Sequence, residues 1–239
     1  MKTENYDSKI LGHKIEYSVH GSSGTVVLLL PPAHVKPSHW DEKGAIEQLS
    51  GLLDQGKLKV YALDSYASKT WDDHQEKVPG RISRLEKFYS FILDEFIPKV
   101  MKAKGKIVIA GIDRGATDAS NLFFGYPKFF KGLVSISGLY KASHFFGPYM
   151  NKEVFRNSLI DALEDIQDEE VLRQYADADI IFSAGSHEHS RPSLEDTMAV
   201  VQLLKDKNIP VLADYWGEDV TPSWDWWNKQ LPYFLAKVA

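Results

Sequence analysis

Short, largely apolar runs alternate along the chain with longer amphipathic segments. Residues 14–20 (KIEYSVH) alternate between polar and apolar positions, which predicts an antiparallel strand. Further apolar runs predict strands that are buried on both faces; they span residues 25–30, 59–63, 106–110, 132–136, 179–182 and 211–215. Apolar residues at helical spacing predict helices over residues 45–53, 81–102, 117–124, 194–207 and 224–236.

This order of elements predicts an α/β fold, with a mostly parallel central sheet and helices on both faces. Neither a repeat nor a linker divides the chain, so we expect a single domain over residues 1–239. Residues 139–179 predict an irregular, partly helical insertion that forms a cap over one end of the sheet. Ligands of such sheets bind beyond the carboxyl ends of the strands, and there we expect the functional site.

The composition narrows the possible functions. The chain has 239 residues, a net charge of -5 and no cysteine, which excludes thiolate nucleophiles, cysteine-ligated zinc and disulfides. Residues 1–10 lack the apolar region of a signal peptide, and the aliphatic run at residues 26–30 is too short to span a membrane. Lys and Arg do not cluster. We therefore expect a cytoplasmic protein whose partner is a small-molecule ligand or substrate, or another protein, and neither nucleic acid nor membrane.

A tight turn follows the strand predicted at residues 106–110. Its sequence is GIDRGA, in which Gly111, Gly115 and Ala116 flank Asp113. Small residues allow the backbone to turn sharply and allow helix and strand to approach. A strand, a turn of this kind and a helix form a nucleophile elbow, which exposes its central side chain. The sequence therefore predicts an elbow with Asp113 at its centre, either as a chemical group or as the N-cap of the next helix.

Five further segments carry a family likeness. They are residues 63–65 (LDS), 89–98 (YSFILDEFIP), 121–124 (NLFF), 136–140 (ISGLY) and 214–235 (DYWGEDVTPSWDWWNKQLPYFL). They are similar to segments at the same places in the α/β-hydrolase superfamily, in the esterase branch that includes esterase D-like and mycolyltransferase-like proteins. The resemblance extends over nearly the whole chain and implies an α/β-hydrolase fold.

The positions that carry catalysis in that family are changed in this chain. The family nucleophile is the Ser of a G-x-S-x-G-G turn, which aligns with Asp113, and the last Gly aligns with Ala116. The family histidine lies in a segment that resembles GHDVNHDW. Here Glu218 and Pro222 stand at its two histidine positions, and no histidine follows His189.

The loss of the histidine decides the mechanism. In a Ser-His-acid set the imidazole takes the hydroxyl proton and returns it to the leaving group. Neither Glu218 nor Pro222 replaces an imidazole, so the resemblance excludes the ordinary serine esterase mechanism. The family acid falls within residues 184–191 (AGSHEHSR), where Glu188 is the single carboxylate.

A rearranged active site is a second interpretation. Haloalkane dehalogenases and epoxide hydrolases, which belong to the same superfamily, use an elbow Asp as nucleophile with a histidine-activated water. Such a site in this chain would combine Asp113 with His187 or His189 and with Glu218. Arg114 would hold the Asp113 carboxylate ionised or neutralise it in an ion pair. The HEH sequence lacks a third metal ligand, so we expect no metal and no cofactor.

Two more groups complete the candidate site. Ala33 and His34 lie in the loop that supplies an oxyanion-hole amide in the family. Trp216 and Trp224 flank the loop that has lost its histidines, within a dense aromatic group. Aromatic residues bury large areas, so this group suits the core, but it also suits a pocket or a contact in a homo-oligomer.

Three functions remain open from the sequence. The first is a non-hydrolytic homologue that keeps the fold and binds a small molecule or a partner. The second is a hydrolase that uses Asp113 and a histidine from the HEH sequence. The third is a scaffold or assembly protein that uses its aromatic surface. We favour the first, because Ser and His are lost while the rest of the chain keeps the family likeness.

Overall fold

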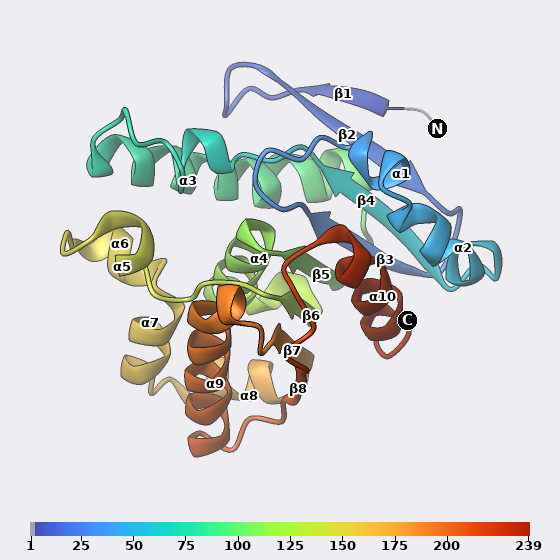
Figure 1. Cartoon of the computed structure of the whole chain (residues 1–239). Coiled ribbons are helices and arrows are strands. Elements are labelled where there is room, and N and C mark those ends of the chain that lie inside the picture. The colour runs from blue at the N-terminus through green and yellow to red at the C-terminus, as the bar shows by residue number, and fades with distance from the viewer. Residues whose placement is uncertain (1–2) are drawn as a thin grey trace.

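The chain folds around a sheet of eight strands in the computed structural model, which describes residues 3–239 (Figure 1). The strand order is β1-β2-β4-β3-β5-β6-β7-β8. Strand β2 is antiparallel to both of its neighbours, and the remaining pairs are parallel. The strands are β1 (Thr3–Asp7), β2 (Lys14–His20), β3 (Thr25–Leu30), β4 (Leu58–Leu63), β5 (Ile107–Ile112), β6 (Phe130–Ile136), β7 (Asp179–Gly185) and β8 (Leu212–Trp216). The predicted fold class is confirmed.

The edge strand β1 was not predicted. Its sequence TENYD has one large apolar side chain, Tyr6, so it carries neither an apolar run nor clear alternation. The strand forms because its backbone pairs with β2, and Tyr6 packs on Phe91 at a ring distance of 6.1 Å. The following loop is fixed by Glu95, which is buried and accepts hydrogen bonds from the Ser8 hydroxyl (2.6 Å) and the Lys9 amide (3.2 Å).

Helices cover both faces of the sheet (Figure 1). They are α1 (His39–Glu42), α2 (Ala45–Asp54), α3 (Val78–Phe91), α4 (Arg114–Gly125), α5 (Ser143–Phe146), α6 (Lys152–Arg156), α7 (Leu159–Asp165), α8 (Glu169–Ala176), α9 (Arg191–Asp206) and α10 (Trp224–Leu235). Single-turn helices lie at η1 (Ala67–Lys69), η3 (Pro127–Phe129) and η4 (Glu188–Ser190). Helices α2 and α10 pack on one face with α1, and α3, α4 and α9 pack on the other.

Strand β3 explains why both faces are apolar. Successive side chains of a strand point to opposite faces. Val27 and Leu29 therefore join the apolar cluster beneath α2 and α10, whereas Leu28 and Leu30 join the larger cluster beneath α3 and α4. A strand covered on both sides needs an unbroken apolar run, which is the pattern that identified it in the sequence.

The long helix predicted over residues 81–102 differs from the observed structure. An α-helix ends at Phe91, and a π-helical segment, η2 (Ile92–Met101), continues it. Pro98 lies inside this segment and has no N–H to donate. The wider π-helical pattern keeps Phe96 and Ile97 buried in the core while the chain passes the proline.

Residues 143–176 form the four short helices α5–α8 between β6 and β7. The sequence predicted irregular, partly helical structure here. Among residues 3–239, no helix has the length and apolar character needed to cross a membrane.

Candidate functional site

The turn between β5 and α4 holds Asp113 in a strained conformation. Its backbone angles are φ 55° and ψ -118°, which a residue with a side chain rarely adopts. Its N–H donates to the Ile136 carbonyl (2.9 Å), and its own carbonyl accepts from the Ala116 amide (3.0 Å). These hydrogen bonds lock the turn and hold the Asp113 side chain at the carboxyl end of the sheet.

Two glycines make this turn possible. A methyl group at Gly111 would lie 2.0 Å from the Gly115 carbonyl oxygen, and one at Gly115 would lie 2.2 Å from the Leu30 carbonyl oxygen. Both contacts are with backbone, which has little freedom to move. The sharp turn was predicted from these small residues, and its role as a nucleophile elbow stays a prediction.

The Asp113 carboxylate has two polar neighbours. The Ala33 amide donates to Oδ2 at 3.4 Å, and Arg114 Nη1 donates to Oδ1 at 3.3 Å. Arg114 is itself held in place, because its Nε donates to Asp72 Oδ1 at 3.1 Å and its guanidinium lies 4.9 Å from the Phe145 ring centre. Asp72 and Asp113 thus share the Arg114 guanidinium, and the three side chains together carry one net negative charge.

A buried carboxylate, Asp118, lies five residues beyond Asp113 and was not predicted from the sequence. Asp118 Oδ1 accepts hydrogen bonds from Trp71 Nε1 at 2.7 Å and from the Tyr89 hydroxyl at 2.8 Å. Burial raises the pKa of Asp118 to about 7, and both hydrogen bonds oppose that rise. Because Trp71 precedes Asp72, this contact fixes the loop that presents Asp72 to Arg114.

Buried Arg81 holds the same loop from the other side. Its guanidinium donates to the carbonyl oxygens of Thr70 (2.8 Å), Phe145 (3.1 Å) and Trp71. Three carbonyl acceptors compensate a charge that burial would otherwise destabilise. Arg81 therefore ties the loop that carries Asp72 to the segment that carries Phe145, and both of these residues contact Arg114.

The structure brings His187 and Glu218 to the same hollow beyond β7 and β8. This hollow has a volume of about 500 Å³ and is also lined by Ser186, Glu188 and Arg191. The His189 ring lies near that of His187, with ring centres 5.0 Å apart and planes tilted by 55°, and the His189 side chain is 74% exposed. In the described residues 3–239, no hydrogen bond or ion pair joins Asp113 to a histidine. The proposed combination of Asp113, a histidine and Glu218 stays a prediction.

The remaining candidate residues are His34, Trp216 and Trp224. His34 is exposed and has a positive φ of 59°, next to the Ala33 amide that faces Asp113. Trp224 packs between Trp40 (5.3 Å) and Trp227 (5.5 Å). Trp216 packs on α10 against Trp226 (6.1 Å), Tyr233 (6.1 Å) and Phe234 (6.3 Å). Both candidate tryptophans therefore make their ring contacts with other aromatic residues.

An acid–imidazole pair, Asp196 with His144, was not predicted from the sequence. Asp196 Oδ2 accepts from the Tyr140 amide (2.6 Å), the Lys141 amide (3.1 Å) and His144 Nε2 (3.0 Å). The carboxylate on α9 thereby fixes the segment after β6, including the residue before Phe145. The sequence contains one signal, a carboxylate near the start of the helix predicted over residues 194–207; the structure shows that this carboxylate is buried.

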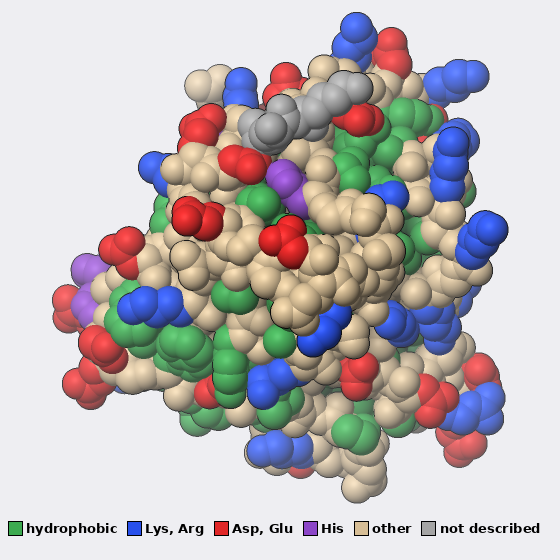
Figure 2. Space-filling view, turned by 90° about the vertical axis from the view of Figure 1, so that its right-hand side faces the viewer, with side chains coloured by type: hydrophobic (Ala, Val, Ile, Leu, Met, Phe, Trp, Pro, Cys, Tyr) green, Lys and Arg blue, Asp and Glu red, His purple; other side chains and the backbone are tan. Residues whose placement is uncertain are grey.

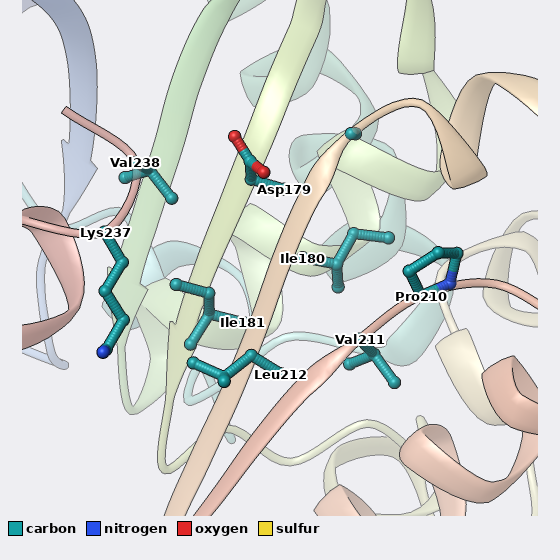
Figure 3. A pocket seen from close by; sticks show the side chains of 9 residues that line it. Asp179, Ile180, Ile181, Pro210, Val211, Leu212, Lys237 and Val238 are labelled. Carbon is teal, nitrogen blue, oxygen red and sulfur yellow. The ribbon is translucent and has the colours of Figure 1, made fainter.

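Two other hollows lie at the opposite end of the sheet. One, of about 360 Å³, is a largely apolar groove beside β8; Figure 3 shows Ile181 and Leu212 between Lys237 and Val211. The other, of about 750 Å³, is lined by His20, Asp41 and Glu47. Figure 2 shows the side of the molecule that lies at the right in Figure 1, where several Asp and Glu side chains lie near a histidine. Across residues 3–239, no three His, Cys, Asp or Glu side chains are grouped so that they could hold a metal ion.

Solved structures share this architecture. A ferulic acid esterase superposes with a TM-score of 0.78 at 18% identity, over 99% of this chain and 96% of that one. S-formylglutathione hydrolase FrmB from Staphylococcus aureus gives a TM-score of 0.69 at 15% identity, over 99% and 97%. MPT51 of Mycobacterium tuberculosis gives 0.72 at 14% identity, over 100% and 98%. No protein-family model matches the chain, and no curated protein matches it in sequence.

The sheet order and these superpositions define an α/β-hydrolase fold. More narrowly, the structural neighbours of this chain are esterase-like α/β-hydrolases. Similarity at these low identities establishes the fold, so the chemistry of this chain has to be argued from its own residues.

Proposed function

We propose that this chain is a non-hydrolytic homologue of the esterase-like α/β-hydrolases, which binds a small polar molecule at the carboxyl ends of its strands. One observation carries the proposal: the residue at the centre of the turn is a carboxylate that is already paired with Arg114, at an Nη1–Oδ1 distance of 3.3 Å. A paired carboxylate is a weak nucleophile, because attack would require it to give up its ion pair.

The surroundings of Asp113 also disfavour ester hydrolysis. Acyl transfer develops a negative charge on the carbonyl oxygen, and an oxyanion hole stabilises that charge with N–H donors. The Ala33 amide lies in the loop for which we expect this role, but it faces Asp113 Oδ2 at 3.4 Å. A carboxylate beside the donor would repel the developing oxyanion. The same amide is well placed to orient the Asp113 carboxylate toward a bound ligand.

The accessible groups indicate the character of the ligand. The side chains of Asp113 and Arg114 are 31% and 23% exposed, so both retain hydrogen-bonding capacity toward solvent. The hollow lined by His187 and Glu218 opens beyond neighbouring strands at the same end of the sheet. Together these residues offer both donors and acceptors. We therefore expect a small molecule with several polar groups.

A hydrolase that uses Asp113 as nucleophile is the second candidate, and the backbone strain at this residue favours it. Residues held in sparsely populated conformations cost about 1–3 kcal/mol and cluster at functional sites. Asp113 keeps this conformation with a reactive type of side chain at the exposed end of the turn. Catalysis would further require a histidine to move within hydrogen-bonding reach of the reacting water.

A hydrolysis panel separates the two candidates. Aryl esters of short acids, a thioester, an epoxide and a haloalkane would be incubated with the wild type, with Asp113→Asn and with the double variant His187→Ala/His189→Ala. We expect the wild type to show no turnover above either variant. Turnover that both changes abolish would establish the rearranged hydrolase and sink the non-hydrolytic proposal.

Ligand binding is tested separately, by thermal shift with a panel of amino acids, sugars and short hydroxy acids. We expect at least one compound to raise the melting temperature of the wild type but not of Asp113→Asn. The matched control is Asp54→Asn, which changes an exposed carboxylate at the end of α2. A stabilising compound that acts equally on all three proteins would place the binding site elsewhere and contradict the proposal.

A further inference from the structure

A cavity between α4, α7 and α8 lies apart from the residues around Asp113. Its volume is about 170 Å³. Six of its lining residues are apolar or aromatic: Phe124, Leu159, Ala162, Leu163, Ile166 and Tyr175. Gly125 and Arg156, the exposed members of the lining, place its opening to solvent between the end of α4 and the end of α6.

The walls of the cavity are well fixed. Leu159, Leu163, Phe124 and Tyr175 are buried, and the Phe124 and Tyr175 rings meet edge to face at a centroid distance of 4.9 Å. The Tyr175 hydroxyl donates to the Phe124 carbonyl, which ties α8 to the end of α4. Because side chains on three helices form the walls, the cavity is a defined space and not a gap along one mobile loop.

The polar groups that line the cavity are engaged with protein partners. The Asn121 amide donates to the Asn157 carbonyl at 3.0 Å. Arg156 Nη2 donates to Glu86 Oε2 at 2.6 Å, which neutralises the guanidinium at the opening. A water molecule needs two to four polar partners to remain in a cavity, and these groups are largely committed.

We propose that this cavity is a binding site for a small, neutral, apolar molecule of about the size of one aromatic ring. An apolar cavity of about 150 Å³ lined by Leu, Ile and Phe stays dry and binds benzene. The cavity in this chain has a similar volume and similar walls. The Arg156–Glu86 pair at its opening carries no net charge, so it gives no advantage to a charged ligand.

This site differs from the groove in Figure 3, which is a hollow beside an edge strand. It also shares no lining residue with the hollow around His187 and Glu218. Binding here is therefore independent of the function proposed for Asp113. Either proposal can fail without affecting the other.

Toluene is the probe, and the methyl signals of Leu159, Leu163 and Ile166 in carbon–proton correlation spectra are the readout. Titration of the wild type is expected to shift these signals saturably. Ala162→Leu adds three carbons to the cavity wall and should weaken toluene binding by about tenfold or more. Ala176→Leu is the matched control, because Ala176 is exposed at the end of α8 and does not line the cavity; it should bind like the wild type.

Ile166→Phe provides a second blocking variant from a partly buried position, in case Ala162→Leu does not fold. It should weaken binding in the same way, with an unchanged far-ultraviolet circular dichroism spectrum. Absence of shifts in the wild type at toluene saturation would overturn the proposal, as would unchanged affinity in the folded blocking variants. Benzoate tests the ligand class: we expect it to bind more weakly than toluene, and equal or tighter binding would overturn the assignment to neutral molecules.

Discussion

The two groups of residues that the sequence singled out differ in how firmly the structure holds them. Asp113 lies in a turn locked by backbone hydrogen bonds, and its partner Arg114 is held by Asp72 and Phe145. His189 and Glu188 have side chains that are 74% and 81% exposed, and the contact between them is 3.9 Å long. Both regions lie at the carboxyl end of the sheet, but only the first is built to keep a side chain in one position.

This difference in how firmly the side chains are held indicates which of the two regions is the better candidate for the functional site. A site acts through groups whose positions are fixed by surrounding contacts, because a loosely held group must be ordered before it binds or reacts. The turn at Asp113 meets this condition before any ligand arrives. The histidine pair does not, and any role for it depends on ordering by a ligand.

The ionisation of Asp118, which holds the loop that carries Asp72, should give the largest change in unfolding free energy among these tests. Its pKa is raised by burial to about 7 from 3.8, so the folded protein holds this proton more tightly than the unfolded chain. The protonated Asp118 carboxyl therefore stabilises the folded protein fully below pH 3.8. This contribution to the unfolding free energy, about 4 kcal/mol in total, is lost as the pH rises to about 7. Asp118→Asn removes this dependence, so it should gain stability relative to the wild type over that interval. Urea denaturation at successive pH values measures the difference, and a flat difference would contradict the prediction.

The next largest change in unfolding free energy is expected when one glycine from each region is replaced by alanine. Gly111→Ala places a methyl group 2.0 Å from a backbone oxygen and should cost about 3 kcal/mol of unfolding free energy. Gly217→Ala, beside Glu218, would meet only the flexible Asp219 carboxylate at 2.8 Å. It should change stability by no more than about 0.5 kcal/mol. Chemical denaturation of both variants checks the contrast, which fails if their costs are similar.

Trp71→Phe should have a smaller effect than Gly111→Ala. It keeps a large ring in the core but removes the N–H that donates to Asp118 at 2.7 Å. A buried carboxylate that loses one of its donors costs about 2 kcal/mol. Loss of the donor should also raise the pKa of Asp118 further, since this hydrogen bond lowers it. The prediction fails if Trp71→Phe leaves both the unfolding free energy and its pH dependence unchanged.

The smallest effect is expected from His187→Ala/His189→Ala. Within residues 3–239, the polar contacts of the two histidine side chains stay within their own segment, so the double variant should change the unfolding free energy by about 0.5 kcal/mol or less. Thermal and urea denaturation measure this change. A loss of more than about 2 kcal/mol would mean that the pair contributes to the fold, and that the contrast between the two regions is wrong.

How much of the fold the sequence predicts depends on how each element is stabilised. The apolar run at residues 25–30 identifies β3 because that strand is covered by helices on both faces. Strand β1 could not be predicted, since backbone pairing with β2 stabilises it and only Tyr6 carries an apolar ring. The break at Phe91 was missed because a π-helical segment retains an amphipathic pattern.

In the candidate site too, residues with a local sequence signal were predicted, and residues that meet only through the fold were not. Asp113 and Arg114 were found because their turn has a local signature of small residues. Asp72 and Phe145 were not assigned to Arg114, since they lie 42 and 31 residues from it and meet it only in the folded chain. The pair of His144 and Asp196 is separated by 52 residues and escaped notice for the same reason.

The contacts around Arg114 also bear on the order in which the chain folds. Ala33, Asp72 and Phe145 reach Asp113 and Arg114 from three distant parts of the sequence, Ala33 through Asp113 and the other two through Arg114. Contacts between residues far apart in the chain form only after the intervening chain has closed, so this group assembles late. The strained angles of Asp113 are then imposed after the transition state, and substitutions that relieve them should slow unfolding while leaving the folding rate nearly unchanged.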